Sequence, residues 1–218
     1  MSNVKSTKGL TVFMSGTTTP AKVVPTGISK AAPAVVTVAD STGMADGQVV
    51  SIIGSGFPEL DGQLFIVGGL TATEFTLIGS DTTASTGTIG TTPEAVYVDD
   101  AKDMVGLCLS TIGINAETAT PISVATFCDP TASIPGAEAG AGTLDLGFYV
   151  DIQSDGYKAL LAAEADGNER IFKITFPGNG DLVMRGIVSS VTITDIPLDG
   201  SAAVTAQVTL SSKPKHRF

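Results

Sequence analysis

Residues 154–176 read SDGYKALLAAEADGNERIFKITF, and the change of periodicity within this stretch decides the fold. Tyr157, Leu160 and Leu161 are spaced i, i+3 and i+4, which places three apolar side chains on one face of a helix. The alanines around them favour the same conformation. The spacing therefore predicts one amphipathic helix over residues 154–166, with its apolar stripe lying on a sheet.

The residues that flank this helix carry start and stop signals. Ser154 or Asp155 can cap the first turn, because a short polar side chain accepts a hydrogen bond from a free backbone amide there. Gly167 is placed to end the helix in a left-handed turn. From Ile171 onward the apolar residues alternate with period two, which is typical of a strand.

Outside residues 154–166, almost the whole sequence has the residue pattern typical of β-strands. Short runs of β-branched and apolar residues are separated by Gly, Pro and Asp-Gly turn signals. The sequence predicts a mainly β protein with one flanking helix and a β-sandwich or barrel core. The predicted strands cover residues 9–15, 35–38, 49–53, 64–67, 75–78, 95–98, 122–127, 144–152, 171–176, 181–196 with a bend at Gly186, and 202–210.

Residues 24–92 differ from the rest in charge and in the spacing of their strands. This stretch has one basic residue, Lys30, and six acidic ones, so its net charge is 1 − 6 = −5. Its β runs recur with turns between them, as in a small barrel or sandwich. We expect an inserted all-β domain at 24–92, interrupting a discontinuous domain of 1–23 and 93–218, because insertions are tolerated at exposed loop tips.

Composition excludes several functions. The chain has 218 residues, 22 acidic against 12 basic, and a formal net charge of −10. Such a chain does not bind nucleic acid by neutralising phosphates. No apolar run is long enough to cross a membrane, so we expect no membrane association.

The residues of catalytic and metal chemistry are scarce. The only histidine is His216, near the C-terminus, and no phosphate-binding loop is present. Asp99, Asp100 and Asp103 could hold a hard cation, but we interpret them as a solvated strand end. Cys108 and Cys128 lack metal-site spacing, and we expect them to be reduced and half-buried. The sequence therefore predicts no cofactor, no metal and no enzyme.

Three segments together resemble the major tail tube proteins of long-tailed bacteriophages of the siphophage type: residues 154–163, residues 171–177 and residues 185–190. Upstream, the strand-like run 122–129 and Ile134-Pro135-Gly136 resemble the family's strand and the long loop after it. The resemblance covers residues 95–210 and the first strand, and rests on order and spacing. The stretch 24–92 is similar to small β modules of other phage structural proteins.

The resemblance implies an assembly function. Family members form homohexameric rings that stack into a tube, and each subunit adds strands to a shared inner barrel. The Gly-, Ala- and Pro-rich loop 129–142 would then contact the neighbouring ring. The assembly residues expected there are Asp129, Pro130, Ile134, Pro135 and Gly136. The basic tail 211–218 and residues 1–8 could become ordered on a neighbouring copy.

The resemblance also gives the negative charge a purpose, because a bore lined with acids and hydroxyls lets DNA slide. We expect DNA to pass during ejection without specific binding, and the inserted domain to face outward. The expected partners are further copies of the chain, the tape measure, and the tail terminator and tail-tip proteins. The protein would be made in the bacterial host cytoplasm and reside in the virion. The acidic candidates for the lumen, chosen in or beside predicted strands, are Asp99, Asp145, Asp151, Asp181 and Asp195.

Two other kinds of function remain open at this stage. The chain could be another phage β protein, such as a tail terminator, a tail-tip ring or a capsid decoration protein. It could also be a host-surface or carbohydrate-binding module. The absence of Trp and the presence of only three tyrosines argue against sugar stacking.

Overall fold

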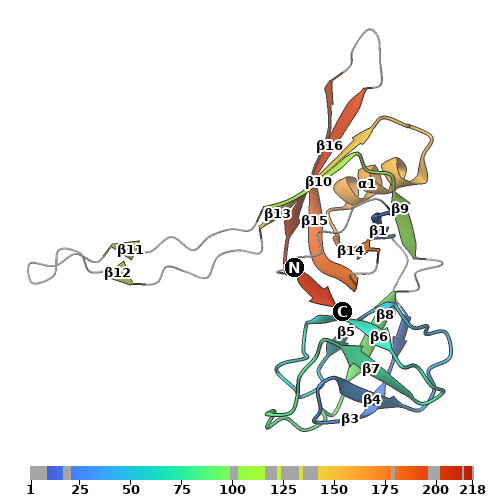
Figure 1. Ribbon diagram of the computed structural model, residues 1–218, viewed down its shortest axis with the longest axis vertical. Coiled ribbons are helices and arrows are strands. Elements are labelled where there is room, and N and C mark those ends of the chain that lie inside the picture. The colour runs from blue at the N-terminus through green and yellow to red at the C-terminus, as the bar shows by residue number, and fades with distance from the viewer. Residues whose placement is uncertain are drawn as a thin grey trace, which may run out of the picture. The chain divides into compact units, whose positions relative to one another are not determined.

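The computed structural model describes residues 9–16, 21–98, 103–115, 122–123, 133–134, 142–177, 180–195, 202–212 and 214–217. These residues are mainly β, with one helix (Figure 1). The predicted fold class, a mainly β chain with one helix, is confirmed. The elements are β1 (Thr11–Ser15), β2 (Ala21–Val23), β3 (Pro25–Ile28), β4 (Ala34–Val38), β5 (Val49–Ile53), β6 (Leu64–Gly68), β7 (Glu74–Ile78), β8 (Glu94–Val98), β9 (Met104–Leu107), β10 (Thr111–Asn115), β11 (Ile122–Ser123), β12 (Ser133–Ile134), β13 (Thr143–Tyr149), α1 (Asp155–Asp166), β14 (Glu169–Phe176), β15 (Gly180–Asp195), β16 (Ala203–Leu210) and β17 (Lys215–Arg217).

The chain divides into two compact units. The first comprises residues 1–107, 171–183 and 215–218, and the second comprises residues 108–170 and 184–214. No helix within the described ranges is long and apolar enough to cross a membrane.

A seven-stranded antiparallel sheet in the first unit has the order β2-β8-β5-β6-β7-β4-β3. The strands at its two ends, β2 and β3, are consecutive in the chain and are separated only by Val24. This short link keeps the two ends of the sheet close, so the sheet curls into a small barrel, although β2 and β3 do not pair with each other within the described residues. We call these strands the β2–β8 barrel. Its interior is filled by apolar side chains, the largest fully buried ones being Phe57, Phe75, Ile52, Leu60 and Leu77.

Two strands of the barrel are buried on both faces. The runs Val49–Ile53 and Leu64–Gly68 have almost no exposed residue, whereas β4 and β7 alternate between buried and more exposed positions. The second face of β5 and β6 is covered because Val49, Leu64 and Ile66 pack with Val183 of β15. Their continuous apolar sequence reflects this two-sided burial.

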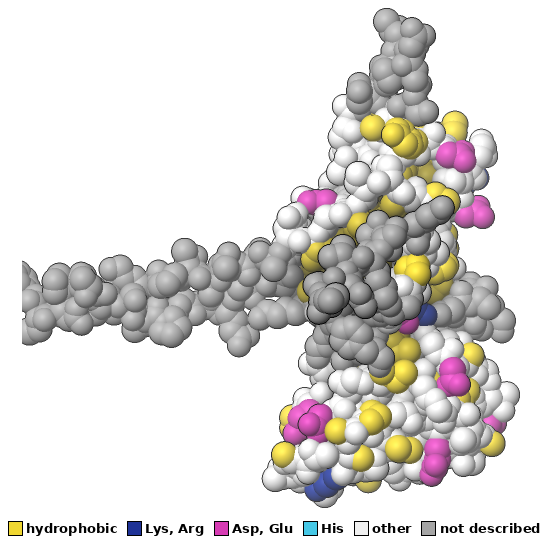
Figure 2. Space-filling view, in the orientation of Figure 1, with side chains coloured by type: hydrophobic (Ala, Val, Ile, Leu, Met, Phe, Trp, Pro, Cys, Tyr) yellow, Lys and Arg dark blue, Asp and Glu magenta, His cyan; other side chains and the backbone are white. Residues whose placement is uncertain are grey.

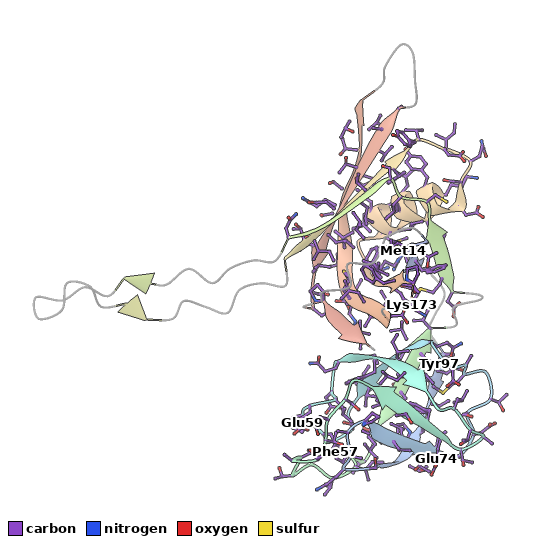
Figure 3. All side chains as sticks on the ribbon, viewed as in Figure 1. Met14, Phe57, Glu59, Glu74, Tyr97 and Lys173 are labelled. Atoms are coloured by element: carbon purple, nitrogen blue, oxygen red, sulfur yellow. The ribbon has the colours of Figure 1, made fainter. Side chains whose placement is uncertain are left out.

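A buried lysine reinforces this contact within the first unit. Lys173 of β14 is only 7% exposed, and its Nζ donates a hydrogen bond of 2.6 Å to the carbonyl oxygen of Gly47 (Figure 3). Gly47 belongs to the Asp46-Gly47 turn and has a left-handed backbone, with φ of 87°. The barrel and β14 thus share a polar contact in addition to an apolar one.

The barrel uses strands that the sequence analysis grouped elsewhere or did not predict. Glu94–Val98, grouped above with the residues after 93, pairs with β5 and with β2. Neither Ala21–Val23 nor Pro25–Ile28 was predicted as a strand, because Pro20 and Pro25 resemble a boundary. The insertion limits at 24 and 92 stay a prediction.

Glycines allow two loops of the barrel to cross in backbone contact. Gly56 has φ of 79°, and a Cβ there would overlap the carbonyl oxygen of Thr88. The amide of Gly90 donates to Ser55 O at 2.7 Å across the same crossing. The run Gly54-Ser55-Gly56 is therefore a packing device between loops.

The second sheet has eight strands, seven of them in the order β10-β13-β16-β15-β14-β1-β9, with β17 paired to β15. In the first unit, β1 lies between β14 and β9. In the second unit, β13 lies between β10 and β16, and β16 pairs with the second half of β15. The register of β15 shifts between Val188 and Ser190.

Helix α1 confirms the predicted caps. Ser154 is the N-cap, and its side chain accepts a hydrogen bond from the Tyr157 amide at 3.3 Å. Gly167 adopts the left-handed conformation, and its amide donates to Ala163 O. The buried face carries Leu160, which is 1% exposed.

Several sequence expectations fall wholly or partly outside the described residues. The predicted strand 122–127 is described only at Ile122–Ser123, which pairs with Ser133–Ile134. The N-terminal residues 1–8 and Cys128 are not described. Residues 215–217 of the basic tail form β17, which pairs with Asp181–Val183 of the same chain. Cys108 is exposed, so the expectation that it is half-buried is wrong.

Candidate functional surface

The strands β10, β13, β16 and the second half of β15 have one polar side and one apolar side. Their cross-strand partners share a side, as in Asp145 with Gln207 and Thr205 with Thr192. The opposite side is buried at Leu144, Leu146 and Val208, which are fully covered, whereas Ile114 on β10 is 40% exposed. We call the outward side the polar face; it carries Thr111, Gly113, Asn115, Thr143, Asp145, Gly147, Thr205, Gln207, Thr209, Ser189, Ser190 and Thr192. Two exposed apolar side chains lie on the same side: Ile187, opposite Thr209, and Tyr149, opposite Ala203.

The polar face has hydroxyls and amides but no basic side chain. None of the residues of β10, β13, β16 or 186–195 is Lys or Arg. Figure 2 shows Asp and Glu side chains scattered over the visible side of the molecule. A polyanion that approached the polar face would meet dipoles rather than fixed positive charge.

Asp145 is held at the centre of this face by two amides. The Asn115 side-chain nitrogen donates to one carboxylate oxygen at 2.7 Å, and that of Gln207 donates to the other at 3.2 Å. Gln207 on β16 lies directly opposite Asp145, whereas Asn115 on β10 lies opposite Thr143 and reaches Asp145 diagonally. The amides fix the direction of the carboxylate without neutralising its charge.

A glycine keeps part of the face shallow. A Cβ at Gly147 would overlap the hydroxyl oxygen of Thr111 on the neighbouring strand. The Gly147 carbonyl oxygen also accepts hydrogen bonds from the amide and the hydroxyl of Ser110, at 2.8 Å and 3.0 Å. A side chain at Gly147 would therefore displace the Thr111 hydroxyl.

The four strands end on two backbone edges. Within the described ranges, β10 pairs with β13 and with no other strand. On β15, the amide of Val191 donates to the carboxylate of Glu164 on α1 at 3.0 Å. A helix side chain thus takes the place of a strand acceptor at this second edge.

The five acidic candidates do not form one cluster. Asp145 lies on the polar face, and Asp195 ends β15 opposite Ala203, with only its backbone described. Asp151 is exposed before α1, where its carboxylate accepts from the Gln153 amide at 3.1 Å. Asp181 accepts from the Thr175 hydroxyl at 2.6 Å in the first unit, and Asp99 is outside the described residues. The assignment of these residues to a lumen stays a prediction.

The expected inter-ring loop is mostly outside the description. Ile134 is part of the short strand β12, whose backbone faces Ile122. Asp129, Pro130, Pro135 and Gly136 are not described.

The acidic residues Asp99, Asp100 and Asp103 lie only partly within the described part of the chain. No group of three or more His, Cys, Asp or Glu residues there could hold a metal ion. Asp103 is buried, so its interpretation as part of a solvated strand end is wrong, and its carbonyl oxygen accepts a hydrogen bond from the Gly16 amide. Asp99 and Asp100 lie outside that part.

Sequence reasoning missed Asn115, Gln207 and Glu164. Asn115 and Gln207 gain their importance from the register of three strands, which no local pattern reports. Glu164 does carry a weak signal. It follows Leu160 by four residues, so it lies on the helix face that meets the sheet and is an unusual acid there.

Comparison with known proteins gives one family. Residues 55–216 match the family model described as phage tail tube protein, TTP. The match begins inside the β2–β8 barrel and runs through the whole polar face. No curated protein matches the chain. Because the family match spans well over half of the sequence, the chain belongs to the phage tail tube protein family.

Proposed function

We propose that this protein assembles into homohexameric rings that stack into the phage tail tube, with the polar face lining a bore through which DNA passes. Family membership supports a structural role in the virion tail and assembly with itself and other tail components. The observation that carries the proposal is the polar face, which has hydroxyls, amides and Asp145 but no basic residue.

The chemistry of the polar face suits transit rather than binding. DNA carries one negative charge per roughly 1.7 Å of its axis, and proteins that hold it neutralise these charges with Lys and Arg. In a tube, each ring would contribute six copies of Asp145. A carboxylate whose direction is fixed by Asn115 and Gln207 would repel phosphates evenly along the bore.

The backbone edges support ring formation. A strand edge that lacks a neighbour pairs readily with a strand of another chain. A contact between two different edges is heterologous, and it closes into a ring when the rotation between copies allows it. The edge of β10 and the edge of β15 are two such surfaces on one chain.

The β2–β8 barrel and the remaining partners follow from this arrangement. A barrel of this size in the bore would obstruct DNA, so we place it outside the tube. The tape measure would occupy the bore before DNA does. The terminator and the tail-tip proteins would cover the two ends of the ring stack. We assign the protein no catalytic role.

The test reverses the charge at the proposed lining. Phage carrying Asp145→Lys should assemble tails but eject DNA more slowly in vitro, and higher salt should relieve the delay. Glu74→Lys is the matched control, because Glu74 is exposed on β7 of the barrel and the charge change is identical. Electron microscopy of the particles would verify tail formation. Normal ejection by Asp145→Lys, or a tube whose polar face points outward, would contradict the proposal.

A further inference from the structure

The second half of β15 lacks a strand on one side. β15 has sixteen residues, and β16 pairs with it from Gly186 to Asp195. On its other side lies β14, which has only eight residues and joins β15 through the short segment 177–179. Strands joined so tightly pair from the turn outward, so β14 flanks the half of β15 that begins at Gly180. In the described ranges, no strand flanks residues 189–195 on that side.

Glu164 occupies this position. Val191 lies opposite Ala206, and its amide donates to Glu164 Oε1 at 3.0 Å. Because the acceptor of this amide is on α1, the amide lies on the side of β15 that faces away from β16. Glu164 reaches it because Leu160, one turn earlier on the same helix face, is buried against the sheet.

The other free edge of the same four strands has the matching properties. β10, with the sequence Thr-Ile-Gly-Ile-Asn, carries no charge, and residues 189–195 of β15 are similarly rich in β-branched and hydroxyl side chains. The five-residue strand β10 is short enough to pair along the seven residues 189–195 of β15. Both edges therefore suit strand pairing.

Strand direction also fits a ring of copies. The pairs β10·β13, β13·β16 and β16·β15 are all antiparallel, so directions alternate across four strands. In a ring with one rotation axis, every copy of β10 points the same way. Because four is even, β15 of one copy and β10 of the next are then antiparallel, like the pairs within each copy.

We propose that the carboxylate of Glu164 is a reversible cap on the β15 edge. When the ring closes, β10 of a neighbouring copy displaces this cap. This inference rests on the proposed tube function and names the two edges that meet. In the free chain this cap accepts the hydrogen bond of the Val191 amide and blocks pairing of the β15 edge with strands of other chains. In the ring a backbone carbonyl of β10 replaces it.

The test measures amide hydrogen exchange in residues 189–195 of the full-length protein, before and after tube assembly. In the free chain, Glu164→Ala should raise the exchange rate of the Val191 amide by roughly tenfold, since a hydrogen bond to a charged group is lost. Glu164→Gln keeps an oxygen acceptor and should change exchange less. Glu74→Ala, on the barrel, is the control and should have no effect there.

Assembly supplies the decisive comparison. In tubes, the Val191 amide should be equally protected in the native protein and in Glu164→Ala. The lag before tube growth, followed by light scattering, should be shorter for Glu164→Ala.

An amide that stays exposed in Glu164→Ala tubes would overturn the pairing of β15 with β10 while leaving the tube function standing. An unchanged lag in a folded Glu164→Ala protein would overturn the role of Glu164 as a cap on the β15 edge. If no variant and no native protein forms tubes, the proposed function itself fails. If Glu164→Ala does not fold, Glu164→Gln provides the same comparison with a smaller expected change.

Discussion

The β2–β8 barrel and the four strands β10, β13, β16 and β15 satisfy their backbone edges in different ways. In the barrel, one residue, Val24, links the two end strands, so both ends of the sheet are held together within a single chain. In the four strands, one edge pairs with nothing in the described residues, and the other is occupied by a glutamate. Similar β-rich sequence thus gives one region whose end strands are joined within the chain and one that suits assembly with copies of itself.

The largest expected effect is a loss of stability caused by a substitution where the two loops of the barrel cross. Gly56→Ala combines a strained left-handed backbone with overlap on Thr88, and should destabilise the protein by about 2–5 kcal/mol. Gly62→Ala is the control, because Gly62 has φ of 72° but open space around it, and it should cost only about 1–2 kcal/mol. Urea unfolding of both variants measures the difference. Equal losses would show that the crossing tolerates a side chain.

The next effect concerns the burial of the barrel's outer side. Ile66→Ala removes a side chain that packs with Val49, Leu64 and Val183, and should cost about 2–4 kcal/mol. Ile78→Ala, at a position that is only partly buried beside the same cluster, should cost less. Thermal unfolding at matched concentration checks the order. The reverse order would mean that the cluster does not stabilise the first unit.

A smaller effect tests how firmly the edge strand β10 is held in the sheet. Asn115→Ala removes the 2.7 Å hydrogen bond to Asp145, and should lower stability by about 0.5–1.5 kcal/mol. Its main result should be faster amide exchange in residues 111–115, because β10 has a strand on one side only. Gln207→Ala removes the longer bond to the same carboxylate from an inner strand and should leave β10 unchanged. Equal exchange in the two variants would contradict this account of the edge.

The smallest effect is a pH dependence in the barrel. The hydroxyl and then the amide of Thr83, both donating to Asp81, lower the pKa of that carboxyl below its ordinary value. A depressed folded-state pKa gives stability that is present above pH of about 4 and is lost as the pH falls through the lowered pKa. Asp81→Asn should therefore reduce the acid sensitivity of unfolding below pH of about 4. Urea titrations across that range measure it, and identical pH profiles for the native protein and Asp81→Asn would exclude the contribution.

Local signals predicted much of this fold because they act within a few residues. The cap at Ser154, the stop at Gly167 and the runs at 49–53 and 64–67 all have direct counterparts in the structure. The strands Met104–Leu107 and Thr111–Asn115 were missed because glycines interrupt their apolar pattern. A glycine in a strand weakens the period-two signal even where the backbone pairs normally.

The candidate surface could be predicted less well, for a physical reason. Asp145 is a candidate because it lies in a predicted strand, and the structure places it on the polar face. Asp181 was chosen in the same way, yet it bonds to Thr175 in the first unit. Which acids share a face depends on register between strands that are far apart in the sequence, and a single chain's pattern does not contain that information.

The two-sided burial of β5 and β6 limits how this architecture can change. Ile171 and Val183 lie on strands outside the barrel, yet their apolar character is useful only while Val49, Leu64 and Ile66 cover them. A relative that dispensed with the barrel would need polar residues at both positions, or another subunit seated over them. Those two residues are therefore markers by which the presence or absence of the barrel could be read in other tail tube sequences.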